Sequence, residues 1–276
     1  MTIIERLQQH KDLEPHKIAL IVDEEEYTYG QLYDAIISME FNNTSRIINL
    51  GQFNDGQKNK VLLIQSLSFV EQLLQWLWGL YKGYISMVCH NEMDAAYIDE
   101  LARIISVEGV PTSADFGVLT SGTTGRPKPL WRSESSWREF FDIQNNIFHI
   151  NKDTKIFLHG SFSFTGVSNM VVAVLWSGGT VITTSSLRPI RWIQLIDKYH
   201  VDHIYALPTK LRLLVRHCKS KLDSTSYIIG GSQVLDRQLM EQLELICPNM
   251  EFILYYGASE LNYITYCTGK EWLDRE

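Results

Sequence analysis

Residues 119–128 gather side chains that suit phosphate binding. They read Leu-Thr-Ser-Gly-Thr-Thr-Gly-Arg-Pro-Lys, with four hydroxyls, two glycines, two cations and no acid. Hydroxyls donate hydrogen bonds, and glycines let backbone amides approach a ligand closely. Because arginine and lysine add positive charge, this composition predicts a loop that binds a polyanion such as a nucleotide triphosphate.

The same stretch departs from the Walker A pattern, in which Gly-Lys-Ser/Thr opens a helix. Pro127 occupies the position of that pattern's second glycine, and Pro127 and Pro129 oppose a helix. We expect a strand over Phe116–Thr120 before the loop and a short extended segment over residues 129–132 after it. Loop amides and hydroxyls, rather than a helix dipole, would then contact the phosphates.

Two further segments carry groups that suit the rest of a nucleotide. Residues 230–233 read Gly-Gly-Ser-Gln, and residues 255–260 read Tyr-Tyr-Gly-Ala-Ser-Glu. Each follows an apolar run that predicts a strand. An aromatic face suits a purine, and a carboxylate oxygen suits a hard cation such as Mg²⁺. Because ligands of open α/β sheets bind at the carboxyl ends of strands, we expect both segments at one site.

Strand and helix patterns alternate along the chain, which predicts parallel strands joined by crossover helices. Thr28 and Gln31, for example, form a Thr-x-x-Gln capping box at the start of a helix. We therefore expect an α/β fold of two lobes, residues 1–112 and 113–276, with largely parallel sheets flanked by helices. The second lobe would carry the three segments described above.

Composition and charge exclude several classes of function. The formal net charge of −7 argues against a general nucleic-acid binder, which would present a basic face. Four widely spaced cysteines fit neither a zinc site nor a disulfide framework, and they favour a reducing, cytoplasmic location. The N-terminus lacks a signal-peptide core, and the most apolar run, residues 170–176, is too short for a transmembrane segment.

The pattern Thr-Ser-Gly-Thr-Thr-Gly-x-Pro-Lys resembles the phosphate loop of the AMP-forming adenylating enzymes. These include acyl-CoA synthetases, firefly luciferase and the adenylation domains of peptide synthetases. Residues 230–233 resemble the family's adenine-lining Gly-Gly turn, and residues 256–260 resemble its Tyr-Gly-x-Thr-Glu motif with serine in place of threonine. Residues 206–209, Ala-Leu-Pro-Thr, resemble its Val-Pro-Thr segment, a structural element ahead of a helix.

This resemblance implies a role for each matching residue. Tyr256 would stack on adenine, Ser259 would contact the α-phosphate, and Glu260 would hold Mg²⁺. Thr120, Lys128 and Glu260 are the residues expected to act in catalysis. The residues expected to bind ATP are Thr120, Ser121, Gly122, Thr123, Thr124, Gly125, Lys128, Gly231, Ser232, Gln233, Tyr256, Gly257 and Ser259.

Residues 162–166, Phe-Ser-Phe-Thr-Gly, differ from the family pattern at the second position. Most members have Phe-His here, and members that activate amino acids have Phe-Asp. Ser163 carries no charge to pair with an α-amino group, which favours a fatty or aryl acid as substrate. Phe162, Ser163 and Gly166 are expected to bind it, although Phe162 and Phe164 would equally suit a core. Of the eight histidines, His159 is the single candidate for a place near the site, and a core role suits it better.

The reaction implied by the resemblance is the attack of a carboxylate on the α-phosphorus of ATP. It gives an acyl-adenylate and pyrophosphate, and coenzyme A then displaces AMP to form a thioester. ATP, Mg²⁺, coenzyme A and a small carboxylic acid are thus the implied cofactors and partners. Two alternatives stay open: an aryl-acid module that loads a carrier protein, and a non-catalytic nucleotide-binding fragment.

The resemblance covers only the large N-terminal part of a family member. The family's Tyr-x-Thr-Gly-Asp motif, its hinge and its small C-terminal domain with a catalytic lysine have no counterpart among the 276 residues. We therefore expect this polypeptide alone to bind nucleotide weakly and to turn over little. We also expect the face that meets the missing C-terminal domain to allow self-association as a homodimer.

Overall fold

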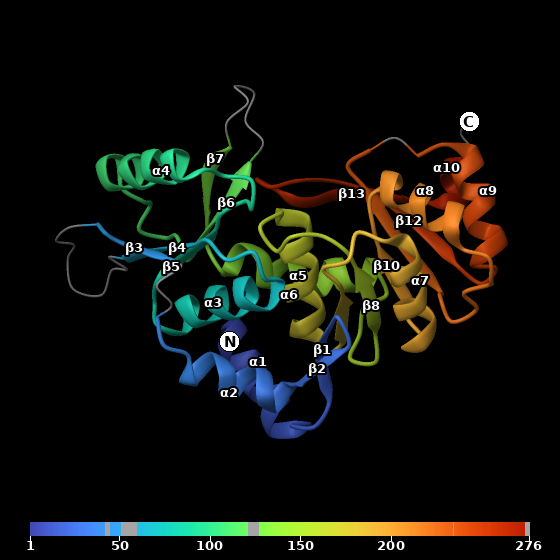
Figure 1. Ribbon diagram of the computed structural model, residues 1–276, viewed down its shortest axis with the longest axis horizontal. Coiled ribbons are helices and arrows are strands. Elements are labelled where there is room, and N and C mark those ends of the chain that lie inside the picture. Colours follow the sequence, from blue (N-terminus) through green and yellow to red (C-terminus); the bar gives the residue numbers. More distant parts are fainter. Residues whose placement is uncertain (42–44, 51–59, 121–126, 234, 274–276) are drawn as a thin grey trace. The chain divides into compact units, whose positions relative to one another are not determined.

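The computed structural model describes residues 1–41, 45–50, 60–120, 127–233 and 235–273. Helices and strands alternate along most of the chain (Figure 1), which confirms the predicted α/β fold. No helix in this described part is both long enough and apolar enough to cross a lipid bilayer. The chain folds into two compact units, and each unit contains one sheet.

The two units interleave along the chain. Unit 1 comprises Met1–Lys17, Thr28–Phe140 and Gly160–Val172, and unit 2 comprises Ile18–Tyr27, Phe141–His159 and Ala173–Glu276. The sequence analysis instead placed a single boundary at residue 112. Strand pairing accounts for the difference, because the strands on both sides of the phosphate loop pair within unit 1, and Ile18–Val22 joins the sheet of unit 2. Thr120 and Lys128 therefore belong to unit 1.

Unit 1 contains a five-stranded sheet in the order β3-β4-β5-β6-β7. Its strands are β3 (Arg46–Asn49), β4 (Lys60–Ile64), β5 (Ile85–Val88), β6 (Phe116–Thr120) and β7 (Lys128–Arg132). The three central strands are parallel, and each outer strand is antiparallel to its neighbour. Among its described residues, four helices belong to this unit alone: α1 (Ile3–Leu13), α2 (Tyr29–Ser38), α3 (Phe69–Tyr81) and α4 (Ala95–Glu108).

Unit 2 contains an eight-stranded sheet in the order β13-β12-β11-β10-β8-β9-β1-β2. The strands are β1 (Ile18–Val22), β2 (Glu25–Thr28), β8 (Lys155–Leu158), β9 (Thr180–Thr183), β10 (His203–Tyr205), β11 (Tyr227–Gly231), β12 (Glu251–Ala258) and β13 (Asn262–Thr268). All neighbours from β1 to β12 pair in parallel, and β13 returns antiparallel to β12.

The helices of unit 2 are α7 (Pro189–Lys198), α8 (Pro208–His217), α9 (Arg237–Ile246) and α10 (Gly269–Leu273). Two further helices, α5 (Ser135–Ile147) and α6 (Thr165–Ser177), contribute residues to both units. Proline occupies the first turn of α7 and of α8, where its missing N–H costs no helical hydrogen bond.

Side-chain caps explain where the first two helices begin. At α2 the Thr28 hydroxyl accepts from the Gln31 amide at 3.1 Å, and the Gln31 side chain accepts from the Thr28 amide at 2.9 Å. This capping box is confirmed as predicted. An equivalent box joins Thr2 and Glu5 at α1, at 3.1 and 2.7 Å. The sequence analysis did not predict α1, although the same signal is present there.

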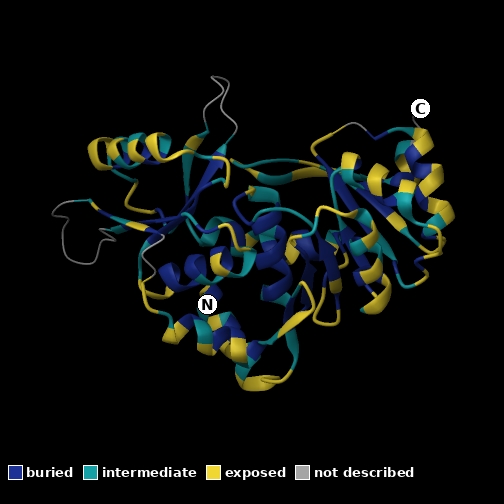
Figure 2. Ribbon diagram, in the orientation of Figure 1, coloured by how far each residue is buried: buried dark blue, intermediate teal, exposed yellow. Residues whose placement is uncertain are grey.

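Each sheet packs apolar side chains into its own core, and Figure 2 shows the central strands largely buried. In unit 1 the core includes Val61, Leu63 and Met87. In unit 2 it includes Phe157, Ile204 and Phe252. Cys89 and Cys247 are buried, and burial raises the pKa of each thiol to about 12. These two thiols are therefore packing residues rather than nucleophiles.

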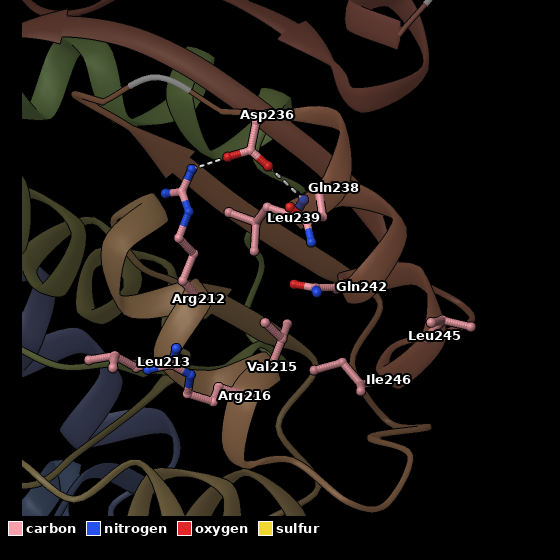
Figure 3. Close-up of a pocket in the computed structure, with 10 residues that line it drawn as sticks. All are labelled: Arg212, Leu213, Val215, Arg216, Asp236, Gln238, Leu239, Gln242, Leu245 and Ile246. Carbon is pink, nitrogen blue, oxygen red and sulfur yellow. Dashed lines mark hydrogen bonds and ion pairs between the residues drawn. The ribbon is translucent and has the colours of Figure 1, made fainter.

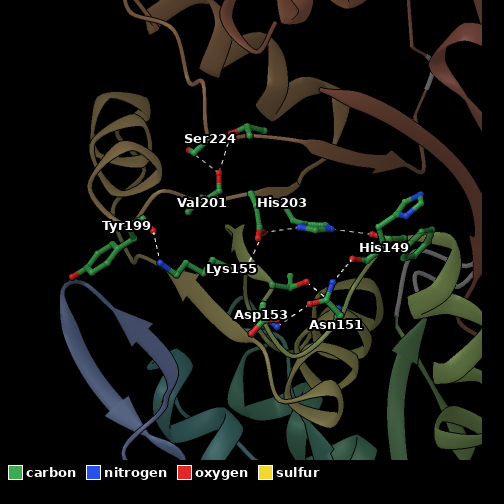
Figure 4. Close-up of polar contacts among 12 residues, drawn as sticks. His149, Asn151, Asp153, Lys155, Tyr199, Val201, His203 and Ser224 are labelled. Carbon is green, nitrogen blue, oxygen red and sulfur yellow. Dashed lines mark hydrogen bonds and ion pairs between the residues drawn. The ribbon is translucent and has the colours of Figure 1, made fainter. Parts of the chain in front are cut away.

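A buried histidine joins two strands of unit 2 to the chain after α5 (Figure 4). His203, at the start of β10, is 2% exposed. Its Nδ1 lies 2.6 Å from Asp202 Oδ1, and its Nε2 lies 3.1 Å from the Phe148 carbonyl oxygen. The same Asp202 oxygen accepts from the Lys155 amide of β8 at 2.9 Å. The hydrogen bonds of His203 and Asp202 therefore link the starts of β8 and β10 to the segment after α5.

We predict that His203→Ala lowers the free energy of unfolding by about 2–4 kcal/mol, because it opens a cavity and leaves the buried Phe148 carbonyl without its partner. Urea denaturation followed by circular dichroism measures this change. His217→Ala is the matched control, since among the described residues that half-exposed ring bonds only to the Leu213 carbonyl of its own helix, and its effect should stay under about 0.5 kcal/mol. Equal losses in the two variants would contradict the prediction.

Candidate functional site

The two glycines of the Gly-Gly turn are the last residues of β11, and the pairing of β11 with β12 fixes their position. Gly231 pairs with Tyr255 in parallel register. A Cβ atom built on Gly231 would lie 2.7 Å from the Tyr255 carbonyl oxygen, which only glycine avoids. Ser232 follows with a positive φ of 63°. The Gln233 side chain then accepts a hydrogen bond from the Thr209 amide at 3.2 Å, which connects the turn to the start of α8.

A cavity of about 710 Å³ lies against this turn. Its lining residues are Ser232, Gln233, Leu254, Tyr255, Tyr256, Gly257, Thr265, Tyr266 and Cys267. Of the residues predicted to bind nucleotide, five lie at or beside this cavity of unit 2: Gly231 at the turn, and Ser232, Gln233, Tyr256 and Gly257 in the lining. The volume falls in the range of small-molecule sites.

The two tyrosines of this cavity have different environments. The Tyr255 hydroxyl lies 2.7 Å from the Tyr205 hydroxyl, and burial raises the pKa of both side chains. Tyr255 is thus a fixed part of the wall. Tyr256 is 63% exposed and lines the cavity. Its ring is therefore available to a flat ligand such as a purine.

Ser259 and Glu260 lie in the hairpin turn between β12 and β13. The Leu261 amide donates to the Ala258 carbonyl at 3.1 Å and closes this turn. Glu260 is exposed, so its carboxylate is accessible to a cation. No group of three or more potential metal ligands occurs among the described residues. Mg²⁺ needs no such cluster of protein ligands when the phosphates of a nucleotide supply its other ligands. A single carboxylate such as that of Glu260 would then fit as the protein ligand.

Strand β13 supplies part of the cavity wall, and the sequence analysis missed it. From the sequence a strand was expected only ahead of residues 255–260, whereas β12 continues to Ala258 and β13 follows over Asn262–Thr268. Thr265, Tyr266 and Cys267 of β13 all line the cavity. A run rich in aromatic and β-branched residues, Tyr-Ile-Thr-Tyr at 263–266, is the signal that could have predicted this strand.

The described ends of the phosphate loop lie on paired strands of unit 1. Thr120 at the end of β6 pairs with Lys128 at the start of β7, and the Thr120 hydroxyl donates to the Lys128 carbonyl at 3.5 Å. The Tyr97 hydroxyl donates to the carbonyl of Pro127. Lys128 is exposed, so its ammonium group is accessible. The predicted residues Ser121, Gly122, Thr123, Thr124 and Gly125 lie outside the described residues.

The three predicted substrate residues occupy different environments in unit 1. Phe162 is 1% exposed, and its ring packs edge-on against Trp76 and Phe69 at centroid distances of 5.7 and 6.0 Å. Its side chain therefore belongs to the core, the second of the two roles considered from the sequence. Gly166 lies in the first turn of α6. Ser163 is 5% exposed and is fully engaged in hydrogen bonds.

The hydrogen-bond partner of Ser163 is a histidine that the sequence analysis did not select. His90 follows β5, and its Nδ1 lies 2.9 Å from the Ser163 hydroxyl. Its ring also stacks on Phe164 at a centroid distance of 5.0 Å. His159, the histidine selected from the sequence, belongs to unit 2 and packs against Trp192 at 4.5 Å. Burial lowers the pKa of His159 to about 4, so the ring is neutral.

A second cavity of unit 2, about 490 Å³, lies between α8 and α9 (Figure 3). Arg212 and Asp236 form an ion pair across it. The residues that line this cavity include none of those predicted to bind nucleotide or substrate.

Comparisons with known proteins identify the family of this chain and its fold. The profile of the "AMP-binding enzyme" family matches residues 111–276. VraA of Staphylococcus epidermidis, provisionally named a long chain fatty acid-CoA ligase, is 25% identical over 286 residues, which cover 96% of this chain and 60% of VraA. The uncharacterized acyl-CoA ligase YhfT of Bacillus subtilis is 28% identical over 183 residues, which cover 66% of this chain and 37% of YhfT. The chain thus spans about three fifths of the length of VraA.

Two solved structures share the fold. The N-terminal domain of FACL13 from Mycobacterium tuberculosis has a TM-score of 0.78 at 16% identity, with 99% of this chain and 80% of that chain covered. O-succinylbenzoate coenzyme A synthetase (MenE) from Bacillus subtilis, solved with ATP and magnesium, has a TM-score of 0.78 at 15% identity, with 98% and 63% covered. Since the family profile matches more than half of the sequence, the chain belongs to the AMP-binding enzyme family.

Proposed function

We propose that this chain is the N-terminal part of an ATP-dependent, AMP-forming carboxylic acid–CoA ligase that acts through an acyl-adenylate. The observation that carries the proposal is the cavity of about 710 Å³ bounded by the Gly-Gly turn and by Tyr256, in a chain of the AMP-binding family. Several relatives are named as acyl-CoA ligases, and MenE was solved with ATP and magnesium, which supports both the reaction class and the cofactors.

The proposed chemistry forms one bond and breaks another at the same phosphorus atom. A carboxylate oxygen attacks the α-phosphorus of ATP, and the bond from that phosphorus to the β-phosphate oxygen breaks, which releases pyrophosphate. Because both reactants are anions, the protein must supply cations and hydrogen-bond donors. In this proposal Thr120 and Lys128 bind the β- and γ-phosphates, Ser259 contacts the α-phosphate, and Glu260 binds Mg²⁺.

We propose a fatty or aryl acid as the substrate. Ser163 is uncharged and its hydroxyl is committed to His90 and Ser161, so it offers no counterion to an α-ammonium group. The names of the relatives support this class, since VraA is named for long chain fatty acids and MenE for o-succinylbenzoate. The proposed acceptor of the acyl group is coenzyme A.

The reaction is tested by ATP–pyrophosphate exchange with a panel of fatty and aryl acids, on this chain and on the complete gene product. In the complete gene product, exchange that depends on one acid, followed by thioester formation with coenzyme A, is the expected result, whereas this chain alone should show little exchange. Transfer to a phosphopantetheinyl carrier protein instead of coenzyme A would identify a carrier-loading module. Absence of exchange by the complete gene product with every acid tested would reject the ligase proposal.

We predict that Tyr256→Ala weakens MgATP binding by roughly 5- to 150-fold, because stacking of one base on an aromatic side chain contributes about 1–3 kcal/mol. Isothermal titration calorimetry measures the dissociation constant. Tyr256→Phe retains the ring and should bind nearly as well as the parent chain. Tyr81→Ala is the matched control, since that tyrosine is 44% exposed and lies in unit 1 at the end of α3. Normal affinity in Tyr256→Ala would contradict the assignment of the adenine site.

We predict that Lys128→Met weakens MgATP binding by about 10- to 150-fold and leaves AMP binding nearly unchanged, because a charge-assisted hydrogen bond to the β- or γ-phosphate contributes about 1.5–3 kcal/mol. Calorimetric titrations with ATP and with AMP separate the two effects. Lys152→Met, at an exposed lysine of unit 2, should alter neither affinity. Parallel losses for ATP and AMP would show that Lys128 does not select the triphosphate tail.

We predict that Glu260→Gln removes most of the dependence of ATP affinity on magnesium, because the amide carries no charge to balance a divalent cation. Titration of ATP at several magnesium concentrations measures this dependence in the parent and in the variant. Glu251→Gln, at an exposed glutamate of the opposite end of β12, serves as the control. A magnesium dependence that persists unchanged in Glu260→Gln would assign the cation to another group.

A further inference from the structure

A continuous hydrogen-bonded chain of buried side chains in unit 1 leads to His90. Gln72, which is 1% exposed, donates from Nε2 to the Ser66 carbonyl at 2.7 Å. Its Oε1 accepts from the Phe162 amide at 3.1 Å and from the Ser161 hydroxyl at 3.2 Å. The hydroxyls of Ser161 and Ser163 lie 2.9 Å apart, and Ser163 lies 2.9 Å from His90 Nδ1.

The numbers of donors and acceptors determine the direction of each hydrogen bond in the series from Gln72 to His90. A backbone amide can only donate and a backbone carbonyl can only accept, so the contacts to Phe162 and Ser66 orient the Gln72 amide. Ser161 must then use its one proton toward Gln72 Oε1. The Ser161 oxygen can therefore only accept a hydrogen bond from the Ser163 hydroxyl. This bond uses the one proton of the Ser163 hydroxyl. The Ser163 oxygen can in turn only accept from His90, so Nδ1 carries the hydrogen.

This direction determines what the other ring nitrogen can do. A neutral imidazole has one N–H, so a proton on Nδ1 leaves Nε2 with a free lone pair. Burial lowers the pKa of His90, and the nearby Glu92 carboxylate opposes this shift without reversing it, so the neutral form prevails at neutral pH. Within the described part of the chain, no hydrogen bond reaches Nε2. The ring therefore offers an acceptor and no donor.

His90 lines a cavity of about 400 Å³ whose walls match that polarity. Met93, Ala96 and Pro127 provide apolar surface, and Glu92 and Glu100 add carboxylate oxygens. No lysine or arginine is among the described residues that line it. Among the described side chains of this wall the charged groups are thus all carboxylates, which favour a hydrogen-bond donor on the ligand over a second carboxylate.

We propose that His90 is a specificity-determining residue for the acyl substrate, with Nε2 accepting a hydrogen bond from a hydroxyl or amino group that the carboxylic acid carries away from its carboxylate. The inference rests on the proposed function, because Ser163 belongs to the segment expected to bind the acid. The serine at position 163 acts as a positioning residue, since it holds the imidazole in the form that can accept.

The first test measures the ring itself. Long-range ¹H–¹⁵N NMR of the chain distinguishes protonated from unprotonated ring nitrogens, and it should find hydrogen on Nδ1 and none on Nε2 of His90. Ser163→Ala removes the acceptor at Nδ1, so the two tautomers should then mix, while His217 provides an internal reference in the same spectrum. A hydrogen on Nε2 in the unsubstituted chain would overturn the inference whatever the acid binds.

The second test measures selection among acids in the presence of MgATP. Matched series are benzoate, 3-hydroxybenzoate and 3-aminobenzoate, and hexanoate, 6-hydroxyhexanoate and 6-aminohexanoate, with binding followed by ligand-observed NMR. The donor-bearing acid of at least one series should bind about 2- to 10-fold more tightly than its unsubstituted parent. His90→Phe should abolish the preference, and His90→Gln, which can donate to Ser163 and still accept, should restore part of it.

The outcomes distinguish a failure of the His90 inference from a failure of the ligase proposal. If acids bind but the donor-bearing members gain nothing, or if His90→Phe keeps the preference, the inference fails and the ligase proposal stands. If no acid binds while MgATP does, the ligase proposal fails and the inference falls with it. The hydroxy and amino members of each series show which donor the site takes.

Discussion

The parallel pairing of β11 with β12 is the constraint on which the candidate nucleotide site of unit 2 depends. It sets Gly231 opposite Tyr255 at a separation that admits no side chain, and it thereby fixes the Gly-Gly turn relative to Tyr256 one residue further on. The antiparallel return of β13 then completes the wall of the cavity. Backbone register, rather than any single side-chain contact, therefore holds the turn and the aromatic ring against one cavity.

Much of the fold could be predicted because local signals agreed with the final structure. The capping box at Thr28 marks the start of α2, and continuous apolar runs mark buried parallel strands such as β4. The division into units could not be predicted in the same way. It depends on β1 pairing with β9, which lies about 160 residues later in the chain, and residue periodicity carries no record of such a partner.

The candidate site shows the same limit at the level of side chains. Contiguous motifs, such as the one that ends in Glu260, could be recognised from residue types alone. The environment of Phe162 could not, because an aromatic residue beside a predicted site is equally suited to a core, and only the packing against Trp76 decides between the two. His90 was missed because its partner Ser163 lies 73 positions away. Its place after β5 was nevertheless a usable signal, since ligands of parallel sheets bind at the carboxyl ends of strands.

The serine at position 163 has a different meaning in the structure than in the sequence. In the sequence, Ser163 means that the histidine usual for the family is missing at this position and that a small uncharged residue replaces it. In the structure a histidine from another element contacts that serine, and a directed series of hydrogen bonds from Gln72 decides which of its nitrogens carries the hydrogen. A charged residue at position 163 would act on a ligand directly. The Ser163 hydroxyl has one proton, which it donates to Ser161, so it must accept a hydrogen bond from His90. The polarity offered to a ligand by His90 is therefore set by an amide buried beneath it, and substitution at Gln72 should change ligand preference without any contact between Gln72 and the ligand.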